Sequence, residues 1–190
     1  MGGTGAAGAG ATSGAAGAEG GSSSIGGASA GGGASVGGSS GGGSAGAPGL
    51  DPCQRSNWKA TASESSVSTT TPTLNTPPLQ AIDGNTTTRW SSGEPQVGGE
   101  WFLIDLGAVA PHLTQIALDT SGHPMDYPVS YKLEASNDGA SYAFVASGSG
   151  SSVTTIKFSD KSARYLKITQ TSASASWWSI HELSISCQSN

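Results

Sequence analysis

From residue 51 onward the chain consists of short runs in which apolar and polar residues alternate, separated by Gly, Pro, Asn and Ser. Tyr131, Leu133 and Ala135 share one face at a period of two, which is typical of a half-buried β-strand. No window of about 11–18 residues has a convincing helical period. The predicted strands cover residues 101–106, 113–119, 129–135, 143–147, 153–158, 163–170 and 180–187. Seven or eight short strands predict an all-β fold, an antiparallel sandwich.

Long stretches between the predicted strands are the functional candidates. They are 69–90 together with 91–99, then 120–128, and 171–179. Loops at one end of a sandwich are where such folds place their binding sites. A shorter connection, Asn137-Asp138-Gly139, predicts a hairpin turn.

Residues 1–50 have a different composition. Of these, 42 are Gly, Ala or Ser, and the large apolar residues are scattered: Met1, Ile25, Val36 and Leu50. Such a segment buries too little apolar surface to offset the entropy of ordering its backbone. The sequence therefore predicts a disordered linker over 1–50 ahead of one folded domain over 51–190.

The charge balance narrows the possible partners. The chain has eight Lys and Arg against 13 Asp and Glu, a net charge of −5, and its basic residues form no cluster. Binding to nucleic acid or to an anionic membrane usually begins with a basic patch, so we expect no nucleic-acid partner and do not favour a membrane. No run approaches the ~18 apolar residues of a membrane span. We expect a monomer.

Cys53 opens the predicted domain and Cys187 nearly closes it. Two Cys at the edges of a β domain predict one disulfide that joins the terminal strands. The alternative is a pair of unpaired thiols in a reducing compartment.

A Gly/Ser tether ahead of a disulfide-bonded domain is typical of secreted or cell-surface proteins. The first residues nevertheless lack the basic and apolar regions of a signal peptide. Either the true start lies upstream or the chain is a fragment, and both alternatives stay open.

Three segments, taken in order, resemble a known family. They are 80–90 (QAIDGNTTTRW), 99–107 (GEWFLIDLG) and 177–183 (WWSIHEL), with 131–142 (YKLEASNDGASY) between the last two. Over roughly residues 53–187 the chain resembles a discoidin, or coagulation factor 5/8 type C, domain. It is most similar to the family 32 carbohydrate-binding modules of secreted bacterial enzymes. The resemblance implies an eight-stranded, galactose-binding-domain-like jelly-roll β-sandwich, a non-catalytic role and, often, one Ca²⁺ ion.

The segment that begins at Asp83 allows two interpretations. Asp-Gly-Asn is a turn sequence in which Asp83 caps its own backbone. Alternatively, Asp83 supplies a carboxylate and Thr88 a hydroxyl to a structural Ca²⁺, which prefers hard oxygen ligands. Glu182 matches the C-terminal ligand of the family. The resemblance implies that three further residues contribute mainly backbone carbonyls: Gln80, Asn85 and His181.

The tryptophans divide by position. Trp58, Trp90 and Trp101 lie in or beside strand patterns and are expected in the core. Trp177 and Trp178 are adjacent at a strand entrance, so their side chains point to opposite faces and at most one is buried. The other is a platform for the apolar face of a sugar ring. We favour Trp177, because Trp178 lies nearer the strand.

Polar loop residues are candidates for binding sugar hydroxyls. His123, Glu94 and Gln96 are the main ones, with Arg89 and Asp126 behind them. Family members often place an Arg in the middle loop, and residues 120–128 contain none.

The function predicted from the sequence is non-catalytic binding of a sugar or glycan. No Ser-His-Asp arrangement or pair of carboxylates stands out as catalytic, so we do not expect an enzyme. The alternative function is a discoidin domain for lipid, membrane-surface or cell adhesion, with Trp177 or Trp178 as an apolar spike.

Overall fold

The computed structural model describes residues 50–64 and 76–188, so most of the predicted linker and part of the first loop block, 69–75, lie outside the described residues. Both helices in the described ranges are single 3₁₀ turns, and neither has the length or apolar character to cross a membrane. In order, the elements are η1 (Arg55–Asn57), β1 (Lys59–Ala62), η3 (Pro78–Ala81), β2 (Trp90–Ser91), β3 (Trp101–Asp119), β4 (Ser130–Ser136), β5 (Ala143–Ser149), β6 (Val153–Gln170), β7 (Ser179–Ile180) and β8 (Glu182–Gln188).

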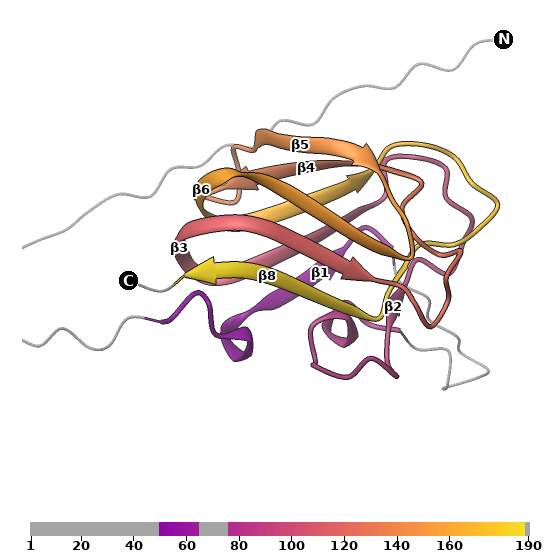
Figure 1. Ribbon diagram of the computed structural model, residues 1–190, viewed down its shortest axis with the longest axis horizontal. Coiled ribbons are helices and arrows are strands. Elements are labelled where there is room, and N and C mark those ends of the chain that lie inside the picture. Colours follow the sequence, from indigo (N-terminus) through magenta and orange to yellow (C-terminus); the bar gives the residue numbers. More distant parts are fainter. Residues whose placement is uncertain (1–49, 65–75, 189–190) are drawn as a thin grey trace, which may run out of the picture. The chain divides into compact units, whose positions relative to one another are not determined.

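Two long strands, β3 and β6, bend and pass from one layer of the sandwich to the other (Figure 1). The sequence predicted each as two separate strands, and this detail was wrong. β-bulges between Asp105 and Gln115 shift the register of the β3–β6 pair without breaking the strands. A bulge interrupts the alternation of apolar and polar residues although the backbone stays extended. From the sequence pattern alone, one bulged strand therefore looks like two strands.

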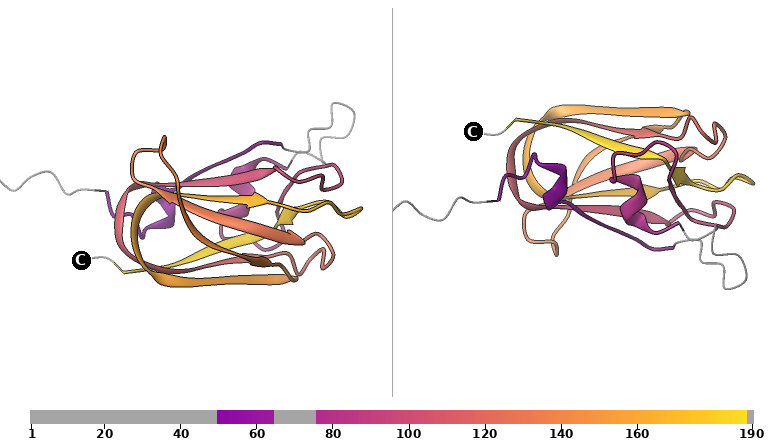
Figure 2. Two further views of the ribbon diagram at one scale, coloured as in Figure 1. Left: turned by 90° about the horizontal axis from the view of Figure 1, so that it is seen from above. Right: turned by 90° about the horizontal axis from the view of Figure 1, so that it is seen from below.

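The two layers share these bent strands. In one layer the strand order is β1-β3-β6-β4-β5, and β8 pairs with the second half of β3 in the other layer (Figure 2). This antiparallel β-sandwich is the predicted fold class.

Side chains from both layers and from the loops fill the core. Trp90 is fully buried, its ring centroid 4.8 Å from that of Phe102 and 4.9 Å from that of Trp178. Trp58 is also buried, as expected. Trp101 is half-buried instead, because it lies on the outer face of β3 with the Lys167 ammonium 5.6 Å from its ring centroid.

The sandwich has two different ends (Figure 1). At one, which we call the bend end, β3 and β6 turn over and β4 connects to β5. The predicted hairpin turn lies there, with Gly139 at a positive φ of 74°. At the other, which we call the loop end, residues 92–99, 120–129 and 171–178 come together.

The two cysteines form a disulfide, as predicted. Cys53 and Cys187 have Cα atoms 5.5 Å apart, although 134 positions separate them in the sequence. Such a long loop is where a cross-link restricts the unfolded chain most.

Candidate functional site

Gln96 joins the three loops of the loop end. Its amide Nε2 donates to the carbonyl of Tyr127 at 3.0 Å and to that of Trp177 at 2.9 Å. Its Oε1 accepts from Gln170 Nε2 at 2.8 Å. Gln96, predicted as a sugar ligand, is only 2% exposed, and in this structure its polar atoms hold the loops together.

The tryptophan pair has one member inside and one outside. Trp178 is fully buried against Trp90, as expected of the member nearer the strand, so of the two predicted binding residues its ring is the one closed off by the core. Trp177 is half-buried, and its carbonyl is held by Gln96. Ser92 binds both backbone groups of Trp178: its N–H donates to the Trp178 carbonyl, and its hydroxyl accepts from the Trp178 N–H. These two bonds fix the orientation of the tryptophan pair. Trp177 therefore remains the candidate platform.

Arg89 and Asp126 lie together beneath the loops. Arg89 Nη1 is 3.4 Å from Asp126 Oδ2, and each side chain is 18% exposed. The hydroxyl of Ser179 donates to the same carboxylate oxygen at 2.7 Å. This arrangement connects the segment before β2, the middle loop and β7, and it leaves both charged groups within reach of solvent.

His123 contacts a second histidine. Its Nδ1 lies 2.9 Å from Nε2 of His181, whose own Nδ1 lies 2.9 Å from the carbonyl of Thr86. A carbonyl only accepts, so Nδ1 of His181 carries the proton, and in neutral His181 the Nε2 atom accepts from His123. Nε2 of His123 is then an acceptor on an exposed side chain. Partial desolvation of the ring lowers the pKa of His123, the nearby Arg89 and His181 lower it further, and Asp126 opposes them.

The two glutamates of the first loop have different surroundings. Glu94 is exposed at the loop surface. Glu100 is 4% exposed, and its carboxylate accepts from the backbone N–H of Val97 at 2.6 Å and of Gly98 at 2.8 Å. Glu100 thus holds the loop in shape, while Glu94 is free to meet a ligand.

The segment predicted to bind Ca²⁺ gathers oxygen atoms. Thr88 Oγ1 lies 2.7 Å from Asp83 Oδ2 and 2.8 Å from the carbonyl oxygen of Asn85. Asp83 also accepts from the N–H of Asn85, so it caps the turn as the first of the two interpretations predicts. A carboxylate, a hydroxyl and a carbonyl are the donors that Ca²⁺ prefers.

Glu182, the predicted second carboxylate, follows His181 at the start of β8. One oxygen is ion-paired with Arg55, and the other, Oε2, is buried without a hydrogen-bond partner. An unpartnered buried carboxylate oxygen fits a cation site. Gln80 is half-buried in η3, which contacts β8. Within the described ranges no three His, Cys, Asp or Glu side chains cluster as a metal site, so this donor set depends on carbonyls and a hydroxyl.

Sequence reasoning missed the residues that position the site. Ser92, Glu100, Gln170 and Arg55 make the contacts that fix the loops or occupy Glu182. The partners of Ser92, Gln170 and Arg55 lie far away in the sequence, so no local pattern could have identified these three, whereas Glu100 bonds to Val97 and Gly98 in its own loop.

Comparisons with known proteins give the following matches. A family model described as F5/8 type C domain matches residues 59–183. No curated protein matches the chain significantly. A family 32 carbohydrate-binding module of Clostridium perfringens, solved with GalNAc-β-1,3-galactose, is 22% identical with a TM-score of 0.59, covering 70% of this chain and 97% of that chain.

Two further solved structures have the same fold. The family 32 module of Clostridium perfringens NanJ, solved with galactose, is 23% identical with a TM-score of 0.59, covering 70% of this chain and 96% of that chain. Chitosan-binding module 1 of a Paenibacillus sp. IK-5 chitosanase/glucanase is 24% identical with a TM-score of 0.57, covering 72% and 98%. At these identities the likeness concerns the fold.

Proposed function

The chain belongs to the F5/8 type C domain family, and we propose that it is a non-catalytic carbohydrate-binding module that binds a sugar or glycan at its loop end. The observation that carries this proposal is the network around Gln96, which holds half-buried Trp177 in one assembly with the middle loop. Loops that are ordered before binding lose less conformational entropy when a ligand arrives.

The groups at the loop end suit a sugar. The Trp177 ring offers an apolar platform, and the Nε2 acceptor of His123 and the carboxylate of Glu94 can accept from hydroxyls. Arg89 and Asp126, partly exposed beneath them, add a donor and an acceptor. Two of the similar modules were solved with galactose or GalNAc-β-1,3-galactose, and a third is a chitosan-binding module. These structures support carbohydrate as the class of ligand.

The state of the carboxylates supports binding without catalysis. Asp126 is ion-paired with Arg89, and Glu100 is occupied by two backbone N–H groups. A glycosidase needs two carboxylates that face one substrate bond. We therefore assign Glu94 and Asp126 to recognition.

A glycan array, probed with the full chain, tests the proposal. We expect retention on one class of glycan. The affinity for one ring should be weak: about 12 heavy atoms at roughly 0.3 kcal/mol each give ~4 kcal/mol, a Kd near ~1 mM. A polymer adds avidity. Absence of binding to any glycan, at a density that captures millimolar binders, would contradict the proposal.

We also propose one structural Ca²⁺ held by Asp83, Thr88 and Glu182 with nearby carbonyls. The close approach of Asp83, Asn85 and Thr88 and the unpartnered Oε2 of Glu182 support it. Binding would require Glu182 to share its carboxylate with Arg55.

Calcium removal tests this site. A cation that binds the folded state alone stabilises it by mass action, so EDTA should lower the melting temperature and Ca²⁺ should restore it. Asp83→Asn should lose that response, whereas Asp160→Asn, at the bend end, should keep it. An unchanged melting temperature on chelation, with no Ca²⁺ by elemental analysis, would reject the site.

Membrane-surface or cell adhesion is the second candidate function. Val97 and Met125, 75% and 65% exposed on loops of the loop end, favour it. The net charge of −5 opposes binding to anionic lipid. Co-sedimentation with phosphatidylserine liposomes separates the two: we expect the chain to stay in the supernatant.

The family and the disulfide support a secreted or cell-surface location. We propose this location together with a monomeric state. Size-exclusion chromatography with light scattering tests the latter.

A further inference from the structure

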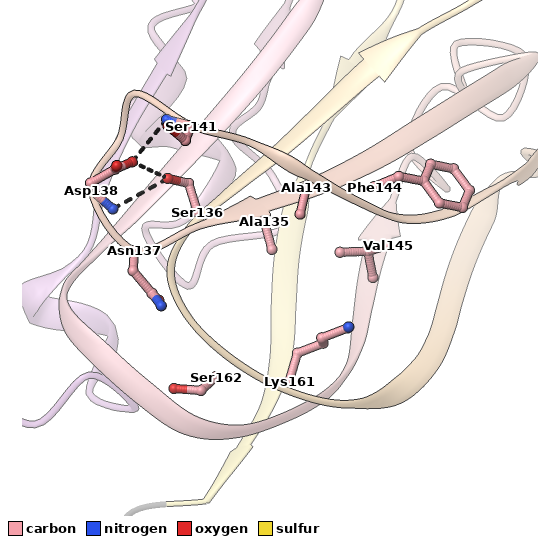
Figure 3. Close-up of a pocket in the computed structure, with 10 residues that line it drawn as sticks. All are labelled: Ala135, Ser136, Asn137, Asp138, Ser141, Ala143, Phe144, Val145, Lys161 and Ser162. Carbon is pink, nitrogen blue, oxygen red and sulfur yellow. Dashed lines mark hydrogen bonds between the residues drawn. The ribbon is translucent and has the colours of Figure 1, made fainter.

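The two layers of the sandwich have different widths, which leaves β5 uncovered. β5 is the edge strand of the wider layer and pairs only with β4 among the described strands. Its residues are exposed or half-buried throughout. Beneath it, between the β4–β5 hairpin and the bend of β6, lies a hollow of about 400 Å³ (Figure 3). The hollow is at the bend end, remote from the loops of the proposed site.

The floor of the hollow is apolar. Ala135, Ala143 and Val145 line it (Figure 3). A register shift in the β4–β5 pair leaves Val145 as an extra residue, because Leu133 pairs with Ala146 and the next residue pairs with Phe144. Bulges re-aim side chains at binding sites.

An aromatic ring lies at the rim of this floor. Phe144 is 62% exposed. In Figure 3 its ring projects at the edge of the hollow, beside Val145. A flat apolar surface of this kind suits the C–H face of a pyranose ring.

Polar groups line the opposite side. Lys161 and Ser162 come from the bend of β6, and Asn137 comes from the hairpin turn (Figure 3). Lys161 is exposed and has no ion-pair partner among residues 50–64 and 76–188. It is the sole cation among the residues that line the hollow.

The acidic residue of the lining is already occupied. Asp138 Oδ1 accepts from the N–H groups of Ala140 at 2.9 Å and Ser141 at 2.8 Å, and from the hydroxyl of Ser136 at 2.8 Å. These bonds lower the pKa of Asp138 to about 2. Asp138 therefore stays ionised, with its Oδ1 held by the hairpin, while Lys161 supplies the positive charge on the opposite side of the hollow.

We propose that this hollow is a second glycan-binding site, which takes a hexuronic acid residue. The ring packs on Phe144 and Val145, the carboxylate pairs with Lys161, and hydroxyls bond to Asn137 and Ser162. The volume holds one ring with bound water. The site is independent of the loop end, and occupation of both ends would let one molecule join two glycan chains.

Titration of the ¹⁵N-labelled full chain with D-glucuronate tests the site, with D-glucose as the neutral probe. We expect glucuronate to shift the amide signals of Asn137, Lys161 and Ser162, with millimolar affinity that falls as salt rises. Glucose should shift them several-fold less. Equal shifts from glucose, or none at these residues, would overturn the proposal.

Matched lysine variants distinguish a specific ion pair between Lys161 and glucuronate from a general effect of the net charge of the domain. Lys161→Met should weaken glucuronate binding by about two- to fivefold, the range expected for the loss of one exposed ion pair. Lys157→Met removes an exposed lysine of the same strand outside the hollow and should leave binding unchanged. Trp177→Ala should also leave it unchanged, so failure here is distinct from failure at the loop end. If Lys161→Met binds glucuronate like the wild type, the proposal is wrong.

Discussion

The side chain of Gln96 makes four hydrogen bonds to segments that are distant in the sequence: to Tyr127, Val129, Gln170 and Trp177. A buried polar group of this kind is costly to remove, because its former partners stay buried without bonds. The loop end is therefore a rigid part of the fold as far as this network extends.

Gln96→Ala should destabilise the domain by about 2–4 kcal/mol, because several buried carbonyl and amide groups lose their partners at once. It should also weaken glycan binding, since Trp177 loses its anchor. Urea unfolding measures the first effect. Val97→Ala, at an exposed side chain next in sequence, should stay within about 0.5 kcal/mol of the wild type. Equal stability of Gln96→Ala and the wild type would refute the structural role.

The alternation of residues along the chain predicted which tryptophan of the pair is buried, but it did not predict the burial of Gln96. Adjacent residues in an extended segment point to opposite faces, so Trp177 outside and Trp178 inside follow from local geometry. The burial of Gln96 depends on partners up to 81 positions away. A polar residue in a polar loop gives no local sign of such partners.

At the scale of elements, an ion pair fixes the first half of β3 to the second half of β6. Arg164 donates from Nε and Nη2 to the two oxygens of Asp105, at 2.7 and 3.0 Å. The bond from Arg164 lowers the pKa of Asp105, burial opposes it, and the N–H of Gly107 lowers it further. The pairing lies where the first register shift of the bend begins.

The depressed pKa of Asp105 gives a pH dependence with a definite sign. A carboxyl whose pKa is lower in the folded state stabilises the fold above its unfolded pKa, and this contribution is lost as pH falls through the folded pKa. Asp105→Asn should therefore lower stability at pH 7 and have progressively less effect below pH ~4. Urea unfolding at several pH values measures this, with Glu94→Gln as an exposed control. A deficit that persists unchanged at pH ~2.5 would contradict it.

The strands differ in how well the alternation of apolar and polar residues predicts them. Strand positions in β4, β5 and β8 followed from alternation and turn residues, because each is a short, regular segment. β3 and β6 did not, because continuity through a bulge is decided by hydrogen bonds to a partner strand. Segments that bend between layers look like two strands with a loop between them.

At the scale of the whole folded region, the sandwich has two chemically different ends. The loop end is held by buried polar side chains and presents Trp177, His123 and Glu94. The bend end carries the disulfide and the hollow beneath β5. Cys53 and Cys187 could be paired from the sequence because just two cysteines exist, whereas the hollow depends on the unequal widths of the layers.

The most direct test of carbohydrate binding at the loop end is the affinity of Trp177→Ala for the glycan that the array identifies, measured by affinity electrophoresis beside Tyr142→Ala. Tyr142 is an aromatic residue of the hairpin turn at the bend end, so its loss controls for aromatic removal. We predict that Trp177→Ala loses retention, that Tyr142→Ala keeps it, and that the melting temperature of Trp177→Ala stays close to that of the wild type. Undiminished retention of a folded Trp177→Ala variant would contradict binding at this end.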